Sequence, residues 1–357
     1  MTSAGQKCAA ALQRPGNADL EKILWSHSAF VSRVAGGLRA QLKSCDLRGA
    51  NFANRVLSDA DLSGSVLAGA MLHFTEFVGA NLYCCDLRGA DASYANFSHA
   101  DMRGAILSGC NLAHARLNCA DCRPGRMLQS GEGGLKDVID PQVASASFSH
   151  SFLSDVDFEN ARLEGADFSG AIIEASRFKG ASLKNAVFQD AVLSGVNLSE
   201  LQVPASVLKT CIVAPSEHSV TGRSRQLEKL KAHQHWIETD GRDGAAAVFD
   251  GDDLRPLAGV VHQCKLTAIS AKGAIAVMMD FSGCELQGAN FENADLRGAN
   301  FENADLRGVR FHNARLDHAR FRGADLRPLR LHSGDYLPCD FTGAEIAENQ
   351  LDVAIRE

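Results

Sequence analysis

Residues 288–308 read GANFENADLRGANFENADLRG, in which the ten-residue phrase ANFENADLRG occurs twice without a change. The finer period is five, because a large apolar residue recurs at every fifth position: Phe291, Leu296, Phe301 and Leu306. A period of five fits neither the 3.6 residues per turn of an α-helix nor the strict alternation of a long strand. The chain must therefore change direction after every unit, so that each unit is one short strand followed by a corner.

The same frame extends through most of the chain, with the large apolar residue as the centre of each unit. A first run has 17 units over residues 42–122, a second has 11 units over 148–198, and a third has 18 units over 266–351. The centre and the residue two before it, usually Ala, point to one side of an extended chain, while the Asp or Asn between them points to the other. We therefore expect the centre and the small residue to face inward.

The units ADLRG and ANFEN closely resemble the repeat of the pentapeptide repeat proteins, and this resemblance covers about two thirds of the chain. It implies an all-β fold, a right-handed quadrilateral parallel β-helix in which four units make one coil around a narrow tube. Four sides also follow from the sequence, because Phe and Leu alternate as centres in the second and third runs, which places like residues on opposite walls. Two stacked Phe columns are expected inside: Phe281, Phe301, Phe321 and Phe341, and Phe148, Phe168 and Phe188.

Two segments with helical apolar spacing, beginning near residue 17 and at residue 224, precede repeats. They align with each other, since His27 and Phe30 match His233 and Trp236, and we expect these residues to pack where each helix meets its tube. We interpret the match as a duplication of a capping helix, a glycine loop and a β-helix. The sequence thus predicts a flexible N-terminus (1–16), a first domain (17–205) with a loop insertion (123–145), a linker (206–221) and a second domain (222–357).

Composition narrows the class of protein. The net charge of -7 opposes non-specific binding to nucleic acids or anionic membranes, so we expect no direct nucleic-acid binding. No stretch approaches 18 consecutive apolar residues and no signal peptide is apparent, which predicts no membrane span and a cytoplasmic location. The 11 cysteines do not form a disulfide framework, and most of them occupy the small inward position, where Cys acts as a small apolar residue.

Few residues in the sequence indicate catalysis or metal binding. Cys119 and Cys122 have the spacing of a redox or zinc half-site, but no second pair follows at zinc-finger spacing and Cys122 falls on an inward centre. A smooth tube offers no deep pocket for a substrate. We therefore expect no enzyme activity, no catalytic residue, no metal and no cofactor.

Six arginines crowd roughly one coil near the end of the third run: Arg310, Arg315, Arg320, Arg322, Arg327 and Arg330. Because Arg310 and Arg330 are twenty residues apart, we expect them to stack on one wall and to form part of a basic band. Such a band fits a carboxylate-rich partner or a phosphate. The competing interpretation is a solvated surface that keeps tubes from associating.

These observations favour a non-catalytic module that acts as a rigid protein-interaction scaffold for an unidentified protein partner, with homodimerisation through the β-helix ends as a further use of its surfaces. The alternative implied by the resemblance is a DNA-mimicking protein that binds or protects a type II topoisomerase, as family members that protect bacterial DNA gyrase do. Acidic residues do fall largely on outward positions, yet none of the three runs is strongly anionic. A supercoiling assay with gyrase distinguishes the two hypotheses.

Overall fold

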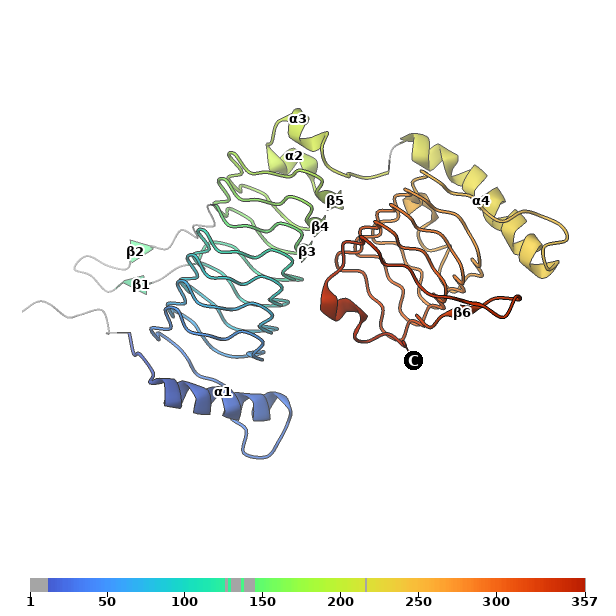
Figure 1. The fold of residues 1–357 in the computed structure, drawn as a ribbon. Helices are drawn as coiled ribbons and strands as arrows, with labels where there is room; N and C mark the ends of the chain where they lie inside the picture. Colours follow the sequence, from blue (N-terminus) through green and yellow to red (C-terminus); the bar gives the residue numbers. More distant parts are fainter. Residues whose placement is uncertain (1–11, 126–127, 130–135, 138–144, 216, 357) are drawn as a thin grey trace, which may run out of the picture. The chain divides into compact units, whose positions relative to one another are not determined.

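The computed structural model describes residues 12–125, 128–129, 136–137, 145–215 and 217–356. The chain divides into two compact units, Met1–Ala214 and Pro215–Glu357, and each is described by itself. In both units the chain winds in stacked coils behind a leading helix (Figure 1).

Parallel bridges join residues that are twenty positions apart, and four bridges follow one another around each coil. The first coil of unit 1 shows them at Gln41 with Asp61, Asp46 with Val66, Asn51 with Met71, and Val56 with Glu76. Most of these contacts are single bridges. Longer strands occur on one wall of unit 1, where β3 (Phe152–Ser154), β4 (Ile172–Glu174) and β5 (Val192–Ser194) form a parallel sheet. Each coil is therefore twenty residues long, with a bridge in every unit of five.

The centres of the units fill the tube, and Phe301 and Leu306 are 0% exposed. At the small inward position, hydroxyl and thiol groups donate hydrogen bonds to the centre of the coil below. Thr75 Oγ1 donates to the carbonyl of Phe52 at 2.8 Å, and Cys85 Sγ donates to the carbonyl of Leu62 at 2.9 Å. Small polar residues are thus tolerated inside because a carbonyl lies within reach.

The outward residues of an ADLRG unit are fixed by local contacts. Asp295 accepts hydrogen bonds from Nε of Arg297 at 2.8 Å and from its Nη2 at 2.6 Å. The corner that follows has a positive φ, 68° at Gly298 and 57° at Asn293. Gly and Asn adopt this left-handed conformation at the lowest cost, which explains why ADLRG ends in Gly and ANFEN in Asn.

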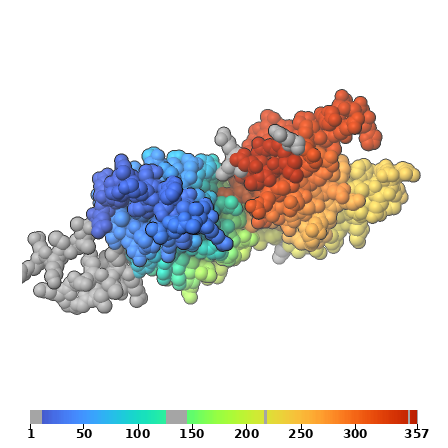
Figure 2. All heavy atoms as spheres, turned by 90° about the horizontal axis from the view of Figure 1, so that it is seen from below, coloured from blue at the N-terminus to red at the C-terminus, as the bar shows by residue number. Residues whose placement is uncertain are grey.

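Helix α1 (Asn17–Val31) leads into unit 1. Its N-cap residue is Gly16, which makes no side-chain cap. Leu24 is 4% exposed, and Leu20 and Ile23 pack against the core of the tube. Seen from below, the dark blue atoms of α1 lie across the start of this tube (Figure 2). The helix therefore covers apolar surface that the first coil would otherwise expose.

Helix α4 (Glu217–Glu238) leads into unit 2 and begins seven residues before the expected start at Ser224. Leu227 and Leu230 pack against the core of unit 2. The first coil also contains a short 3-10 helix, η1 (Arg255–Leu257), and the last residues of the unit contain another, η2 (Glu348–Leu351).

The end of unit 1 departs from the expected repeats. Leu198, expected as a centre, is 36% exposed and begins α2 (Leu198–Leu201), because Asn197 caps this helix by accepting the N–H of Ser199 at 3.2 Å. A second short helix follows, α3 (Ala205–Leu208). Ile212 then pairs with Val192 as a further rung. The range 206–221, expected as a linker, contains the boundary between the two units after Ala214, and it also holds the end of α3, a rung of the tube and the start of α4.

The insertion expected at 123–145 leaves the coil, since Asn111 pairs with Ser147, well beyond the regular spacing of twenty. Its β1 (Leu128–Gln129) and β2 (Lys136–Asp137) pair antiparallel. The rest of it, residues 126–127, 130–135 and 138–144, lies outside the described residues, as do residues 1–11 of the expected flexible N-terminus.

A second insertion was not expected from the sequence. In unit 2, β6 (Leu329–Arg330) and β7 (Tyr336–Leu337) form an antiparallel hairpin, and Arg310 pairs with Asp340 instead of with residue 330. The extra ten residues equal two units, so the frame of five continues across them. They do, however, turn the register by half a coil.

This half-coil step corrects one of the expected Phe columns. Phe281, Phe301 and Phe321 stack with ring centroids 5.3 and 5.4 Å apart. Phe341 does not continue this column: it stacks on Phe311 at 5.1 Å and meets Phe321 edge-on at 6.2 Å. In unit 1, Phe148, Phe168 and Phe188 stack at 5.0 and 4.9 Å.

Candidate functional site

The six arginines of the expected basic band do not share one face. Arg310, Arg315 and Arg320 lie in three successive bridge columns, and Arg327 follows Asp325 of the fourth. Arg330 lies in β6 opposite Tyr336, outside the coil, and the place above Arg310 is taken by Asp340. The expected stacking of Arg310 and Arg330 is therefore wrong, because the hairpin removes Arg330 from the wall.

Carboxylates compensate three of these six charges. Arg315 Nε lies 3.0 Å from Glu345, Arg327 Nη2 lies 2.7 Å from Asp325, and Arg310 Nε lies 3.7 Å from Glu292. The hydrogen bond from Arg327 holds the pKa of the Asp325 carboxyl below its usual value. Arg320, Arg322 and Arg330 form no ion pair with any residue in the described part of the chain. What remains for an anionic partner is chiefly Arg320 and Arg322, which lie two residues apart.

Acidic side chains form a column along one wall of unit 1, and basic side chains compensate them in turn. The ion pairs are Asp61 with Lys43 (3.0 Å), Asp101 with Arg103 (2.6 Å), Asp121 with Arg123 (2.7 Å) and Asp157 with Arg177 (2.8 Å). This wall is therefore a column of alternating charges rather than an anionic surface.

His27 joins α1 to the tube of unit 1. It is 0% exposed, and its Nδ1 accepts a hydrogen bond from the backbone N–H of Ala40 at 3.1 Å. Its ring stacks on Phe30 with centroids 5.8 Å apart. Burial lowers the pKa of this imidazole, which is consistent with a neutral ring that accepts at Nδ1. Gly37 lies against the same turn of the helix, where a Cβ would be 2.3 Å from the backbone nitrogen of Phe30.

His233 makes the same junction in unit 2. Its Nδ1 accepts the N–H of Ala247 at 3.2 Å, and its ring stacks on Trp236 at 5.6 Å. Burial lowers the pKa of His233 as well. Gly244 takes the place of Gly37, since a Cβ there would lie 2.8 Å from the backbone nitrogen of Trp236. Both histidines therefore have a structural role that accounts for their burial.

The Cys119 and Cys122 pair has no second half. Both thiols are free; Cys119 is exposed on a corner, whereas Cys122 is buried and burial raises its pKa. Within the ranges that the structure describes, no three His, Cys, Asp or Glu side chains lie close enough together to hold a metal ion.

The feature that the sequence analysis missed is an outward stack of aromatic rings on one corner of unit 1, here called the corner stack. Its members are Phe74, Tyr94, His114 and His150. Successive ring centroids are 4.8, 4.6 and 5.1 Å apart, with the planes within 21° of parallel. At Gly170, one coil further on, a Cβ would come within 2.8 Å of the His150 ring.

Each member of the corner stack occupies a left-handed corner, with φ of 57°, 58°, 57° and 53° in chain order. Phe and Tyr rarely adopt this conformation, whereas His adopts it more readily. The spacing of twenty between Phe74, Tyr94 and His114 was visible in the sequence, but the insertion after Cys122 hides the fourth member. An aromatic residue recurring at the corner position was the signal to look for.

Two further apolar side chains are exposed in the coils at the lower end of the corner stack. Phe74 is 39% exposed, Met71 is 42% exposed and Val56 is 38% exposed. The ring of His73 meets Phe74 edge-on at 6.2 Å. None of these side chains contributes to the filling of the tube.

Comparison with known proteins places the chain in a family. The model of the pentapeptide repeats matches eight copies within residues 45–109, 144–204 and 264–327, more than half of the chain. The chain therefore belongs to the pentapeptide repeat family, whose members form β-helices. No curated protein matches the sequence significantly. Within the described residues, no helix has both the length and the apolar character needed to cross a membrane.

Three solved structures are among those similar to the chain. A pentapeptide repeat protein of the Arabidopsis thaliana thylakoid lumen is 28% identical over 35% of this chain and 70% of its own, with a TM-score of 0.23. HetL of the cyanobacterium Nostoc, involved in the regulation of heterocyst differentiation, is 18% identical over 93% and 94%, with a TM-score of 0.20. QnrB1, a plasmid-mediated fluoroquinolone resistance protein, is 17% identical over 53% and 98%, with a TM-score of 0.23.

Proposed function

We propose that this protein is a non-catalytic scaffold for protein interaction, built from right-handed four-sided coils, and that the corner stack of unit 1 is a contact surface for its partner. The observation that carries the proposal is the corner stack itself. Four stacked rings occupy outward positions where the fold needs only Gly or Asn. Aromatic side chains are enriched in the centres of protein interfaces, where they contribute much of the binding energy.

The backbone conformation supports a role outside folding. A left-handed φ at a bulky residue such as Phe74 or Tyr94 costs about 1–2 kcal/mol. Stacking of these outward rings offsets part of this cost, by about 0.5–1.5 kcal/mol a pair. Retaining four such residues in one column is therefore better explained by contact with a partner than by stability. The exposed Met71 and Val56 in the coils around Phe74 favour a partner that presents apolar side chains.

The test is capture of partners from a lysate of the source cell with matched variants. The double variant Phe74→Asn and Tyr94→Asn removes two rings and keeps the corners, since Asn accepts a left-handed φ. The control is His99→Asn, a corner residue with φ of 61° outside the corner stack. We expect the wild type and the control to capture the same proteins and the double variant to lose them. Identical capture by all three would contradict the proposal.

A DNA-mimicking inhibitor or protector of a type II topoisomerase is the second candidate, because one wall of unit 1 carries four Asp residues in a column that Asn81 interrupts. The ion pairs that compensate Asp101, Asp121 and Asp157 oppose it, since a mimic must present net negative charge. A supercoiling assay with purified gyrase separates the candidates. We expect no effect at micromolar protein, and inhibition or protection of gyrase would reverse the order of the two proposals.

A further inference from the structure

In the regular part of the tube, three backbone groups of every unit bind the coil above. In the unit centred on Leu163, the carbonyl of Ala161 accepts the N–H of Ser182 at 2.9 Å, and the N–H of Leu163 donates to the carbonyl of Ser182 at 2.8 Å. The N–H of Gly165 donates to the carbonyl of Lys184 at 2.9 Å. One acceptor and two donors thus form the upper edge of each unit.

The unit one coil higher, residues 181–185, leaves the same three groups open. Among the described residues, none is a hydrogen-bond partner of the Ala181 carbonyl or of the N–H groups of Leu183 and Asn185. Gln202, twenty residues after Ser182, would provide the next rung. It adopts a left-handed φ of 49° at the end of α2 instead, so the chain leaves the wall there.

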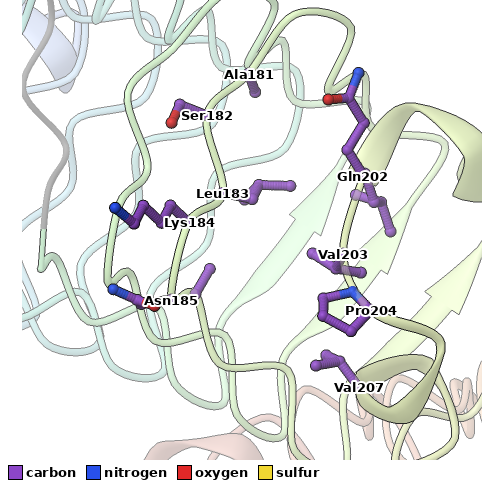
Figure 3. Close-up of a pocket in the computed structure, with 11 residues that line it drawn as sticks. Ala181, Ser182, Leu183, Lys184, Asn185, Gln202, Val203, Pro204 and Val207 are labelled. Carbon is purple, nitrogen blue, oxygen red and sulfur yellow. The ribbon is translucent and has the colours of Figure 1, made fainter.

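A groove of about 600 Å³ lies between this open edge and the segment that leaves it. Figure 3 shows residues 181–185 on one side and Gln202, Val203, Pro204 and Val207 on the other. Polar and apolar groups line the groove in about equal measure, and Lys184 is the single charged residue among them. Lys184 is exposed and forms no ion pair with any described residue.

Unit 1 already shows an extended segment added to an edge of its tube. At the start of the tube, Gln13 lies before α1 and outside the coils, and it forms a parallel bridge with Cys45. Its N–H donates to the carbonyl of Ser44 at 3.2 Å, and its carbonyl accepts the N–H of Asp46 at 2.8 Å. A short extended piece of chain is therefore sufficient to complete an edge.

We propose that the open edge at residues 181–185 binds an extended segment of a partner protein as an added parallel strand. The inference rests on the proposed scaffold function and names the chemistry of the partner. In the register of the tube, the partner residue above Leu183 points into the groove toward Val203 and Val207, so it is apolar. The next residue lies above Lys184, on the outer side of the wall, and is acidic because it meets the uncompensated charge of this exposed lysine.

The first test measures binding of a peptide to the full chain. The peptide is labelled with fluorescein and contains Ala-Asn-Leu-Glu-Asn twice. We expect saturable binding in fluorescence anisotropy. Amide hydrogen exchange of Leu183 and Asn185 should slow at saturating peptide, because their N–H groups become donors to the added strand. The N–H groups of Phe178 and Gly180, which are also open but do not line the groove, serve as the internal control and should not change.

The second test exchanges the charges. Lys184→Glu should weaken binding of the peptide about fivefold. A peptide with Lys in place of Glu should bind this variant about as tightly as the original peptide binds the wild type. Lys179→Glu is the matched control, since Lys179 is an exposed lysine of the same coil that does not line the groove. Val207→Trp should fill the groove and abolish binding of both peptides, with a thermal melt to verify that the variant is folded.

No saturable binding to the wild type, equal binding to Lys184→Glu, or protection confined to Phe178 and Gly180 would overturn the added-strand proposal. These outcomes are separate from a failure of the scaffold function. If the corner-stack variants lose their partners while the peptide does not bind, the scaffold function stands and the added strand is wrong. If neither experiment detects binding, both are wrong.

Discussion

Unit 2 contains a stack of aromatic rings inside its tube, and unit 1 carries one on its outer corner. The inner rings of Phe281, Phe301 and Phe321 lie 5.3 and 5.4 Å apart, and the rings of the corner stack lie 4.6–5.1 Å apart. Both stacks place one ring in each coil, every twenty residues except where the insertion after Cys122 separates His114 from His150. The difference lies in the place within the unit of five, which is the centre in one stack and the corner in the other.

That difference separates folding from function. At the centre, a ring excludes water and polar atoms, so each Phe stabilises the tube through the area that it buries. At the corner, a ring keeps part of its surface in water and imposes a left-handed φ on its own backbone. An aromatic residue at the centre is therefore explained by the fold, whereas the aromatic residues at the corner are the basis of the proposed partner contact.

The largest effect is expected from placing a charge in the inner stack. Phe301→Asp buries a carboxylate between Phe281 and Phe321 without a partner, which should cost more than about 4 kcal/mol and unfold unit 2. Circular dichroism during thermal unfolding of the full chain measures this loss. Glu302→Lys, on the outside of the same unit, is the control and should change stability by less than about 0.5 kcal/mol. Equal shifts for both variants would contradict the inner position of Phe301.

Deletions test whether the inner stack depends on the length of the coil. Removing residues 289–308 takes out one complete coil, so the remaining rings keep their register and the tube shortens by about 4.8 Å. Removing residues 289–291 alone points the following centres outward and should abolish folding. Thermal unfolding of the two variants tests whether the twenty-residue deletion is the more stable one. A three-residue deletion that still folds would contradict a coil of twenty residues.

Acidification should act on the buried rings at the two helix junctions. The pKa values of His27 and His233 are lowered by burial, so the folded protein binds fewer protons than the unfolded chain. Their contribution to stability is complete above the unfolded pKa of 6.5 and is lost as the pH falls below it. Urea unfolding at pH 8 and pH 5 measures the loss. In the double variant His27→Gln and His233→Gln, the free energy of unfolding should depend less on pH than in the control His99→Gln. An equal pH dependence in both variants would show that the two buried histidines are not its cause.

The smallest effect on stability is expected at the corner stack. Phe74→Asn removes an exposed ring and relieves a strained backbone, so the free energy of unfolding should change by less than about 0.5 kcal/mol. Chemical denaturation of the full chain measures it. A loss as large as that of a buried Phe would show that the corner stack belongs to the fold, and it would remove the reason for assigning a partner to it.

The family and the period of the coil could be predicted from the sequence, because an inward residue at every fifth position leaves a direct mark in the chain. The hairpin around β6 and β7 could not, because its ten extra residues preserve the frame of five while they move Phe341 to the other column. The same hairpin explains why the expected basic band failed at Arg330. The corner stack could not be predicted from the apolar centres of the units, because Phe74 and Tyr94 lie at the last position of the unit, the corner.

The junctions of His27 with Ala40 and of His233 with Ala247 also have a consequence for synthesis. In each unit the helix precedes its tube along the chain, so a ribosome releases the helix before the first coil. Each later coil then meets an edge that is already complete, and folding can follow translation from one end to the other. A nascent chain released as far as residue 122 is accordingly expected to resist protease over its coils, before any of the second unit has been made.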